Sequence, residues 1–216
     1  MLGELGPGAR IGEYVIERSA PTRGTGHLYE ATHRVLPRRV TLKVLPAAAP
    51  WNSALAVQLL REACIVEALD HPGIPRVYEC GTLADRRPWV ATEIVVGPTL
   101  TQQIATRALS VVQVVAIVRD VAETLAYAHA RGLVHRAVSP RAIVFPPGAR
   151  RFPLCLVDWS SARTRDSTTP LPFAPPLAVA PYLAPEQLRG GDTDDRGDVF
   201  ALGMVARELI DTIGRA

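Results

Sequence analysis

The chain has 216 residues, 48% of them hydrophobic, and a formal net charge of +3. This length and composition allow a sizeable core, in one domain or in one two-lobed unit. The net charge is too small to indicate a nucleic-acid partner. The most apolar segment, residues 111–118, is too short to span a bilayer, so we expect neither nucleic-acid nor membrane binding.

Cysteine usage bears on the cellular compartment. The three cysteines, Cys64, Cys80 and Cys155, are odd in number and far apart, and each lies among apolar residues. Small buried hydrophobic side chains are therefore expected, rather than a disulfide framework or a metal site. The first ten residues lack the apolar run of a signal peptide, and we expect a cytoplasmic protein.

The first half of the chain is predicted to be mainly β-structure. A β-branched run over residues 40–45 places Thr41 and Lys43 on one face of a strand. Asn52 or Ser53 can cap a helix that runs to about Leu69. Further strand patterns are expected over residues 14–18, 27–32, 76–80 and 89–95.

Lys43 is the only lysine among 24 Lys and Arg residues, which indicates a position where arginine would not serve. Glu62 falls on the apolar stripe of the predicted helix. A carboxylate on an inward face needs a partner, and Lys43 on a neighbouring strand is the obvious one. The alternatives are a lysine retained by chance and a solvated glutamate at the edge of the stripe. We predict the ion pair.

The second half begins at Gly97 and Pro98, which break the chain between a first lobe over residues 1–96 and a second over residues 97–216. We predict that Ser110 caps a long helix that stops near Gly132. Three further segments are expected: a short strand over 154–157 that leads to Asp158, an irregular Pro-, Ser- and Thr-rich stretch over 163–185, and an apolar helix over 198–213.

Seven stretches resemble the motifs of protein kinases, in the order that this family has them. Their sequences most resemble those of bacterial Ser/Thr kinases of the eukaryotic-like type. A P-loop NTPase is excluded, because no G-x-x-x-x-G-K-[ST] pattern occurs. The stretches are VTLK (40–43), REACIVEAL (61–69), WVATEIVVGPTL (89–100), LVHRAVSPRAIV (133–144), VDWS (157–160), PYLAPEQL (181–188) and DVFALGMVARELI (198–210).

The resemblance implies an α+β, protein-kinase-like two-lobed fold, with a β-rich N-lobe and a helical C-lobe that lacks its last helices. It implies ATP and magnesium as cofactors, with Asp158 as the metal ligand. It also implies that Asp198 braces the backbone of the loop at 133–144. Thr92 would be the gatekeeper beside the hinge, and the implied nucleotide-binding positions are Lys43, Glu62, Thr92, Glu93, Val95 and Val144.

The chemically active positions of the loop at 133–144 depart from the family. Ala137 stands where kinases have the aspartate base, Ser139 where they have lysine, and Ala142 where they have the metal-binding asparagine. Loss of a general base alone costs about 10²–10⁴-fold in rate. These three departures are hard to reconcile with an efficient enzyme.

The nucleotide-binding positions depart as well. Pro21 and Arg23 replace the first two glycines of the family's glycine-rich loop, Thr41 replaces a small alanine over adenine, and Trp159 and Ser160 follow Asp158 in place of Phe and Gly. Glycine lets the backbone approach phosphate, whereas proline fixes φ and removes a donor. We therefore expect binding of ATP and magnesium to be weak or absent.

The sequence thus predicts a pseudokinase that acts through protein contacts. The alternatives are a Ser/Thr protein kinase with residual phosphotransfer from ATP, and a decayed, truncated paralogue without a selected role. The retention of Lys43, Glu62 and Asp158 argues against simple decay. Fold alone does not settle whether the domain is an enzyme.

Two further expectations concern regulation and assembly. Arg136 matches the family arginine that pairs with a phosphate in the activation segment, although an unmodified linker is equally consistent with the sequence. The helix at 198–213 carries apolar residues on more than one face, so we expect self-association or a protein partner. An exposed, mobile loop is expected to carry the candidate phosphorylation sites Ser160, Ser161, Thr164, Ser167, Thr168 and Thr169.

Overall fold

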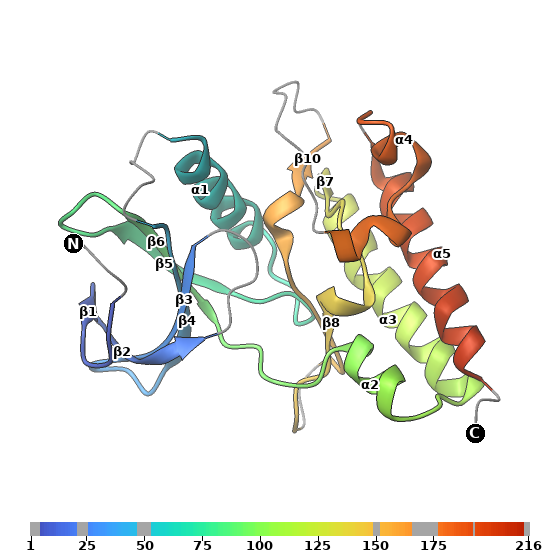
Figure 1. The fold of residues 1–216 in the computed structure, drawn as a ribbon, viewed down its shortest axis with the longest axis horizontal. Helices are drawn as coiled ribbons and strands as arrows, with labels where there is room; N and C mark the ends of the chain where they lie inside the picture. The colour runs from blue at the N-terminus through green and yellow to red at the C-terminus, as the bar shows by residue number, and fades with distance from the viewer. Residues whose placement is uncertain are drawn as a thin grey trace. The chain divides into compact units, whose positions relative to one another are not determined.

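The structure is a computed structural model that describes residues 5–20, 26–46, 53–148, 152–165, 177–191 and 193–213, without the side chains of Ala54 and Gln58. The chain divides into two compact units, whose elements are labelled in Figure 1. The first unit comprises Met1–Ala68 and Pro75–Ile94, and the second comprises Leu69–Ile74 and Val95–Ala216.

Within the described residues, the first unit contains a six-stranded antiparallel sheet in the order β1-β2-β3-β4-β6-β5. The five predicted strands are all present, and β1 is an addition that the sequence did not indicate. The strands are β1 (Arg10–Ile11), β2 (Tyr14–Ala20), β3 (His27–His33), β4 (Arg39–Val44), β5 (Val77–Thr82) and β6 (Pro88–Glu93).

Helix α1 (Ala54–Glu67) packs against β5 and β6 of this sheet. The Ser53 hydroxyl caps its N-terminus by accepting a hydrogen bond from the Ala56 amide at 3.2 Å, as one of the two predicted caps. The other candidate, Asn52, lies outside the described residues.

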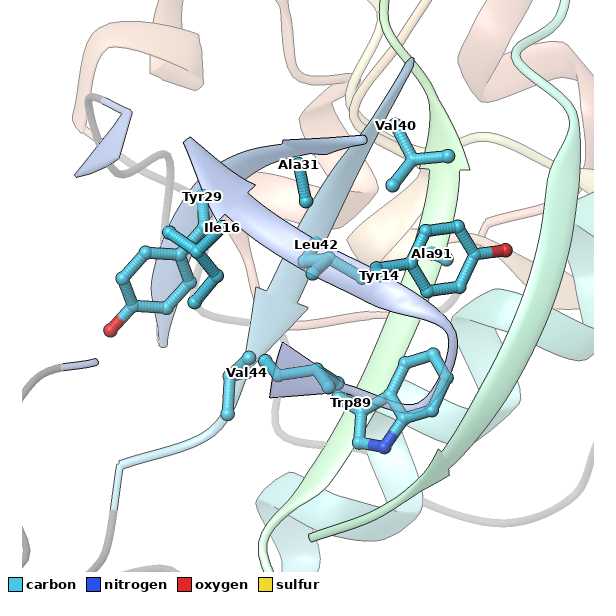
Figure 2. Packing of buried hydrophobic residues seen from close by; sticks show 10 residues of the cluster. Tyr14, Ile16, Tyr29, Ala31, Val40, Leu42, Val44, Trp89 and Ala91 are labelled. Atoms are coloured by element: carbon cyan, nitrogen blue, oxygen red, sulfur yellow. The ribbon is translucent and has the colours of Figure 1, made fainter. Parts of the chain in front are cut away.

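The alternation of β4 places three apolar side chains on one face of the sheet. Val40, Leu42 and Val44 are fully buried in a cluster that includes Tyr14 and Trp89 (Figure 2). Burial of each such side chain contributes about 1.5–3 kcal/mol to stability. Because side chains alternate along a strand, Thr41 and Lys43 point to the opposite face, as predicted.

The second unit is mainly helical. Its helices are α2 (Leu100–Thr106), α3 (Val111–His129), α4 (Pro185–Leu188) and α5 (Asp195–Thr212). Two short antiparallel pairs join its loops, β7 (Leu133–Val134) with β10 (Arg163–Thr164) and β8 (Ile143–Val144) with β9 (Cys155–Leu156). The helices α3 and α5 lie side by side (Figure 1).

The ends of α3 agree with the prediction. Ser110 forms a capping box with Gln113, and Gly132 follows the helix with φ +71°, a conformation that glycine adopts without strain. No helix in the described ranges is both long and apolar enough to cross a membrane.

Two expectations about the fold are wrong. Cys64 and Cys80 are exposed, because apolar neighbours in sequence do not fix the face of a helix or of the edge strand β5, and only Cys155 of the three is buried. The last helix begins at Asp195, where the Asp194 side chain caps it, rather than at Asp198. The stretch 163–185 was expected to hold no long regular element, and its described residues contain only short ones, such as the two-residue strand β10 and a 3-10 helix over Leu177–Tyr182.

Candidate functional site

In the first unit, the predicted ion pair between β4 and α1 is present. The Lys43 ammonium lies 2.9 Å from the Glu62 Oε2 atom, and each side chain is 20% exposed. The structure therefore confirms the pair, and it places a half-buried ammonium and its counter-charge on the face of the sheet that packs against α1.

Strand register places the predicted gatekeeper on the same face. Thr92 of β6 lies opposite Thr41, and Val90 lies opposite Lys43, so these side chains share one face of the antiparallel pair. The Thr92 hydroxyl is 3.5 Å from the Thr41 carbonyl oxygen. Pro21 and Arg23, which bear on the predicted phosphate loop, lie outside the described residues.

The predicted hinge strand ends the first unit. The Glu93 amide donates to the Arg76 carbonyl oxygen at 2.8 Å, and the Glu93 carboxylate accepts from the Arg76 amide at 3.3 Å. Glu93 is therefore fixed at the end of β6. Val95 and Val144 belong to the second unit.

In the second unit, a buried carboxylate organises the loop at 133–144. Asp198 of α5 is fully buried and accepts hydrogen bonds from the His135 amide at 2.8 Å and the Arg136 amide at 2.7 Å. Its Oδ2 atom also lies 2.8 Å from the His129 Nε2 atom. The predicted brace is thus confirmed, and its partner His129 on α3 was not predicted. Arg136 takes φ +68°, and hydrogen bonds fix its backbone on both sides, from its amide to Asp198 and from Gln187 to its carbonyl oxygen.

The His135 side chain links this loop to the segment before Asp158. Its Nδ1 atom accepts from the Ala137 amide at 3.3 Å, so its Nε2 atom donates to the Val157 carbonyl oxygen at 3.2 Å. Burial holds the pKa of His135 below its ordinary value, which keeps the imidazole neutral and suits this tautomer.

The three substituted positions of the loop are all buried. Ala137 is 4% exposed and belongs to an apolar cluster with Val179 and Leu183 of the downstream segment. Ser139 is 1% exposed and Ala142 is 2% exposed. The position of the family's base is therefore filled by an apolar contact, a feature that no local sequence pattern signals.

The predicted metal ligand lies in a strained turn. Asp158 has φ 67° and ψ 57°, and its Oδ1 atom accepts a hydrogen bond from the Ser160 hydroxyl at 2.8 Å. Between them, the Trp159 indole is 2% exposed and donates to the Leu156 carbonyl oxygen at 2.9 Å. In the described part of the chain, no three His, Cys, Asp or Glu side chains gather as a metal cluster.

The downstream segment is tied to the same loop by polar contacts. Gln187 is buried, and its side chain donates to the Arg136 carbonyl oxygen at 3.0 Å while accepting from the Ala184 amide at 3.1 Å. Tyr182 donates to Glu208 of α5 at 2.5 Å. Burial, and then this hydrogen bond, raise the pKa of Tyr182 well above its ordinary value. Sequence reasoning did not identify Gln187 or Tyr182 as anchors.

The candidate phosphorylation sites fall into two groups. Ser160 and Ser161 lie half-buried in a 3-10 turn, and Thr164 lies in β10, paired with Leu133. The expectation of a mobile loop is therefore wrong for these three residues, because the turn and the strand pairing fix their backbone. Ser167, Thr168 and Thr169 lie outside the described residues.

Comparison with known proteins identifies the family. Residues 23–213 match the family described as "Protein kinase domain". The chain belongs to the protein kinase domain family. The Ser/Thr protein kinase PknJ of Mycobacterium tuberculosis is 31% identical over 97% of this chain, and PknB of Mycobacterium leprae is 33% identical over 87%. The chain spans only 36% of PknJ and 30% of PknB.

A solved structure agrees on the fold. The Mycobacterium tuberculosis PknI kinase domain superposes with a TM-score of 0.73 at 30% identity, covering 99% of this chain and 80% of that chain. The protein-kinase-like fold, with a β-sheet N-lobe and a helical C-lobe, is therefore confirmed. The roles of the individual site residues remain predictions.

Proposed function

We propose that this kinase domain is a pseudokinase, which binds a nucleotide weakly, transfers phosphate poorly or not at all, and acts through protein contacts. One observation carries the proposal. Ala137, at the position of the family's base, is buried in an apolar cluster with Val179 and Leu183. This position offers no group that could accept a proton from a substrate hydroxyl.

The neighbouring positions strengthen the proposal. Ser139 supplies no cation for the transferred phosphate, and Ala142 supplies no oxygen for a metal. Phosphoryl transfer depends almost entirely on positioning and on electrostatic stabilisation of the phosphate oxygens. A loop without the base, the cation and the metal ligand lacks the groups that would position the substrate and stabilise the phosphate charge.

The residues proposed to bind nucleotide are better preserved. The Lys43 ammonium, balanced by Glu62 at 2.9 Å, suits the α- and β-phosphates of ATP. The hinge positions Glu93 and Val95 would meet adenine through backbone groups, and the family resemblance also assigns Thr92 and Val144 to the nucleotide. Magnesium, when bound, would neutralise phosphate charge, and Asp158 would supply one carboxylate ligand. One carboxylate fits weak rather than tight metal binding.

A Ser/Thr kinase with residual activity is the second candidate. Its support is the intact frame of the loop at 133–144, in which Asp198 holds the amides of His135 and Arg136. The relatives PknJ and PknB are named Ser/Thr protein kinases. The same frame speaks against simple decay, because an unselected chain would have no reason to keep a buried carboxylate and its partners together.

Protein contacts are the proposed means of action. Exposed apolar side chains on α5, Val199, Phe200 and Ile210, support an interaction surface. Cys64 and Cys80 are exposed free thiols, which suits a reducing compartment, and we propose the cytoplasm.

A paired assay tests the proposed function. Thermal unfolding with and without ADP and magnesium reports nucleotide binding, and transfer of labelled phosphate from ATP to protein or peptide reports catalysis. We expect a small ADP-dependent rise in Tm and turnover far below the typical kinase range of about 1–100 s⁻¹. Turnover within that range would replace the pseudokinase with the second candidate.

A further inference from the structure

We propose that the Ser160 hydroxyl is a second cation ligand beside Asp158, and that it supplies an oxygen in place of the one that Ala142 lacks. This inference rests on the proposed nucleotide-binding function and adds a residue that the family resemblance does not assign. Its basis is the contact between the Ser160 Oγ atom and the Asp158 Oδ1 atom, at 2.8 Å.

The spacing of the two oxygens suits one small divalent cation. Magnesium binds oxygen ligands at about 2.0–2.1 Å in octahedral geometry, so two adjacent ligands lie about 2.9 Å apart. The observed separation of 2.8 Å is that of an ordinary hydrogen bond, and it would need to change little for both oxygens to bind one cation. Without a cation, the hydroxyl donates its proton to the carboxylate. With a cation, the hydroxyl would rotate, turning a lone pair toward the metal and its proton away.

The segment that carries both oxygens is anchored on either side of the pair. The Trp159 indole donates to the Leu156 carbonyl oxygen at 2.9 Å, and its ring lies edge-on to His135 with a centroid distance of 4.5 Å. Trp159 and His135 are both buried. The two oxygens are therefore presented by a turn whose central residue is fixed, which reduces the ordering cost of binding a cation.

The chemistry of the pair has a known counterpart in unrelated nucleotide-binding proteins. P-loop NTPases hold magnesium with a Ser or Thr hydroxyl and an aspartate, and the nucleotide phosphates complete the shell. Glycine at the Ser160 position would offer no such oxygen. The competing interpretation is that the hydroxyl only caps Asp158 and so competes with a cation. In that case, removal of the hydroxyl would strengthen cation binding rather than weaken it.

The experiment uses Mn²⁺ alone as the probe, because its paramagnetism broadens nearby NMR signals even when binding is weak. The Trp159 indole N–H lies between the two proposed ligands in sequence, and its signal can be assigned with Trp159→Phe. Titration of the whole chain with Mn²⁺ should broaden this signal selectively. Ser160→Ala should shift the midpoint about tenfold upward, in line with the cost of perturbing metal-site residues.

Matched variants distinguish the loss of the Ser160 hydroxyl from a general disturbance of the turn. Ser161→Ala removes a hydroxyl from the next residue of the same half-buried turn and should leave the midpoint unchanged. Ser160→Thr keeps the hydroxyl and should retain most of the affinity. Asp158→Asn should abolish the selective broadening. Circular dichroism and Tm of each variant show whether the turn and the fold survive the substitution.

Two results would overturn the inference. One is a Ser160→Ala protein that binds Mn²⁺ as tightly as the wild type or more tightly, which would make the hydroxyl a cap. The other is a wild type whose Trp159 signal does not respond to Mn²⁺. A wild type that binds Mn²⁺ through Ser160 but shows no affinity for ADP would contradict the proposed nucleotide binding and leave the cation site standing.

Discussion

Asp198 holds the backbone amide of Arg136 at 2.7 Å, and the residue that follows Arg136 is an alanine buried against apolar side chains. The frame of the kinase loop and its catalytic group are therefore separable. The frame depends on a buried carboxylate of α5, whereas catalysis would depend on the side chain at position 137. This chain retains the first and lacks the second.

The buried carboxylate should be essential to the stability of the second unit. Asp198→Ala leaves the amides of His135 and Arg136 and the His129 ring without their acceptor. We expect the free energy of unfolding to fall by about 3–5 kcal/mol, measured by urea denaturation. Asp195→Ala is the control, because Asp195 is only partly buried and its pair with Arg165 should contribute less than about 1 kcal/mol. Similar losses for both variants would contradict the assigned brace.

The lysine of β4 should control nucleotide binding. For the wild type, ADP at ten times its Kd should raise the free energy of unfolding by about 1.4 kcal/mol. Lys43→Ala should abolish this rise, because it removes the ammonium proposed to contact the phosphates. Arg39→Ala, on the same face of the same strand, should keep it. The response to ADP is measured as a thermal shift. If Lys43→Ala responds as the wild type does, Lys43 has a purely structural role.

Much of this arrangement could be predicted from the sequence. The alternation of residues 40–45 placed Lys43 on the face opposite to Val40, Leu42 and Val44, and the helical stripe placed Glu62 within its reach. Motif order identified Asp198. The cluster of Ala137 with Val179 and Leu183 could not be predicted, because it joins residues some 40 positions apart that share no periodicity. The exposure of Cys64 and Cys80 was missed for a related reason, since local hydrophobicity does not fix which face is covered.

Thiol accessibility tests the corrected placement of the cysteines. Cys64 and Cys80 are exposed and Cys155 is buried. A thiol reagent should therefore modify two cysteines rapidly in the native protein and the third only on unfolding. Mass spectrometry of the labelled peptides identifies the sites. Rapid native labelling of Cys155 would contradict the structure of β9.

Tyr182 should make stability depend on alkaline pH. Burial and the bond to Glu208 raise the pKa of Tyr182 in the folded state above its unfolded value of about 10. Its contribution is therefore fully present below pH 10 and declines above it, because the unfolded chain then releases the proton first. Urea midpoints between pH 8 and 11 should fall more steeply for the wild type than for Tyr182→Phe. Parallel slopes would mean that Tyr182 titrates normally.

Restoring the base alone should not restore catalysis. Ala137→Asp places a carboxylate among Val179 and Leu183, and we expect a loss of about 1–3 kcal/mol in the free energy of unfolding. Ala122→Asp, at an exposed position of α3, is the control for the change of residue type. The prediction is wrong if Ala137→Asp is as stable as its control and transfers phosphate at a normal kinase rate. The apolar cluster would then not exclude a catalytic carboxylate from position 137.

The most direct test of the pseudokinase assignment is the rate of phosphate transfer from ATP by the unmodified chain, with magnesium or manganese. The triple variant Ala137→Asp, Ser139→Lys, Ala142→Asn serves as a gain-of-function comparison. We predict no transfer above the background of Lys43→Ala for the unmodified chain, while ADP still raises its Tm. Transfer by the unmodified chain at about 1–100 s⁻¹, lost on Lys43→Ala, would show that the domain is an active kinase with an unfamiliar catalytic loop.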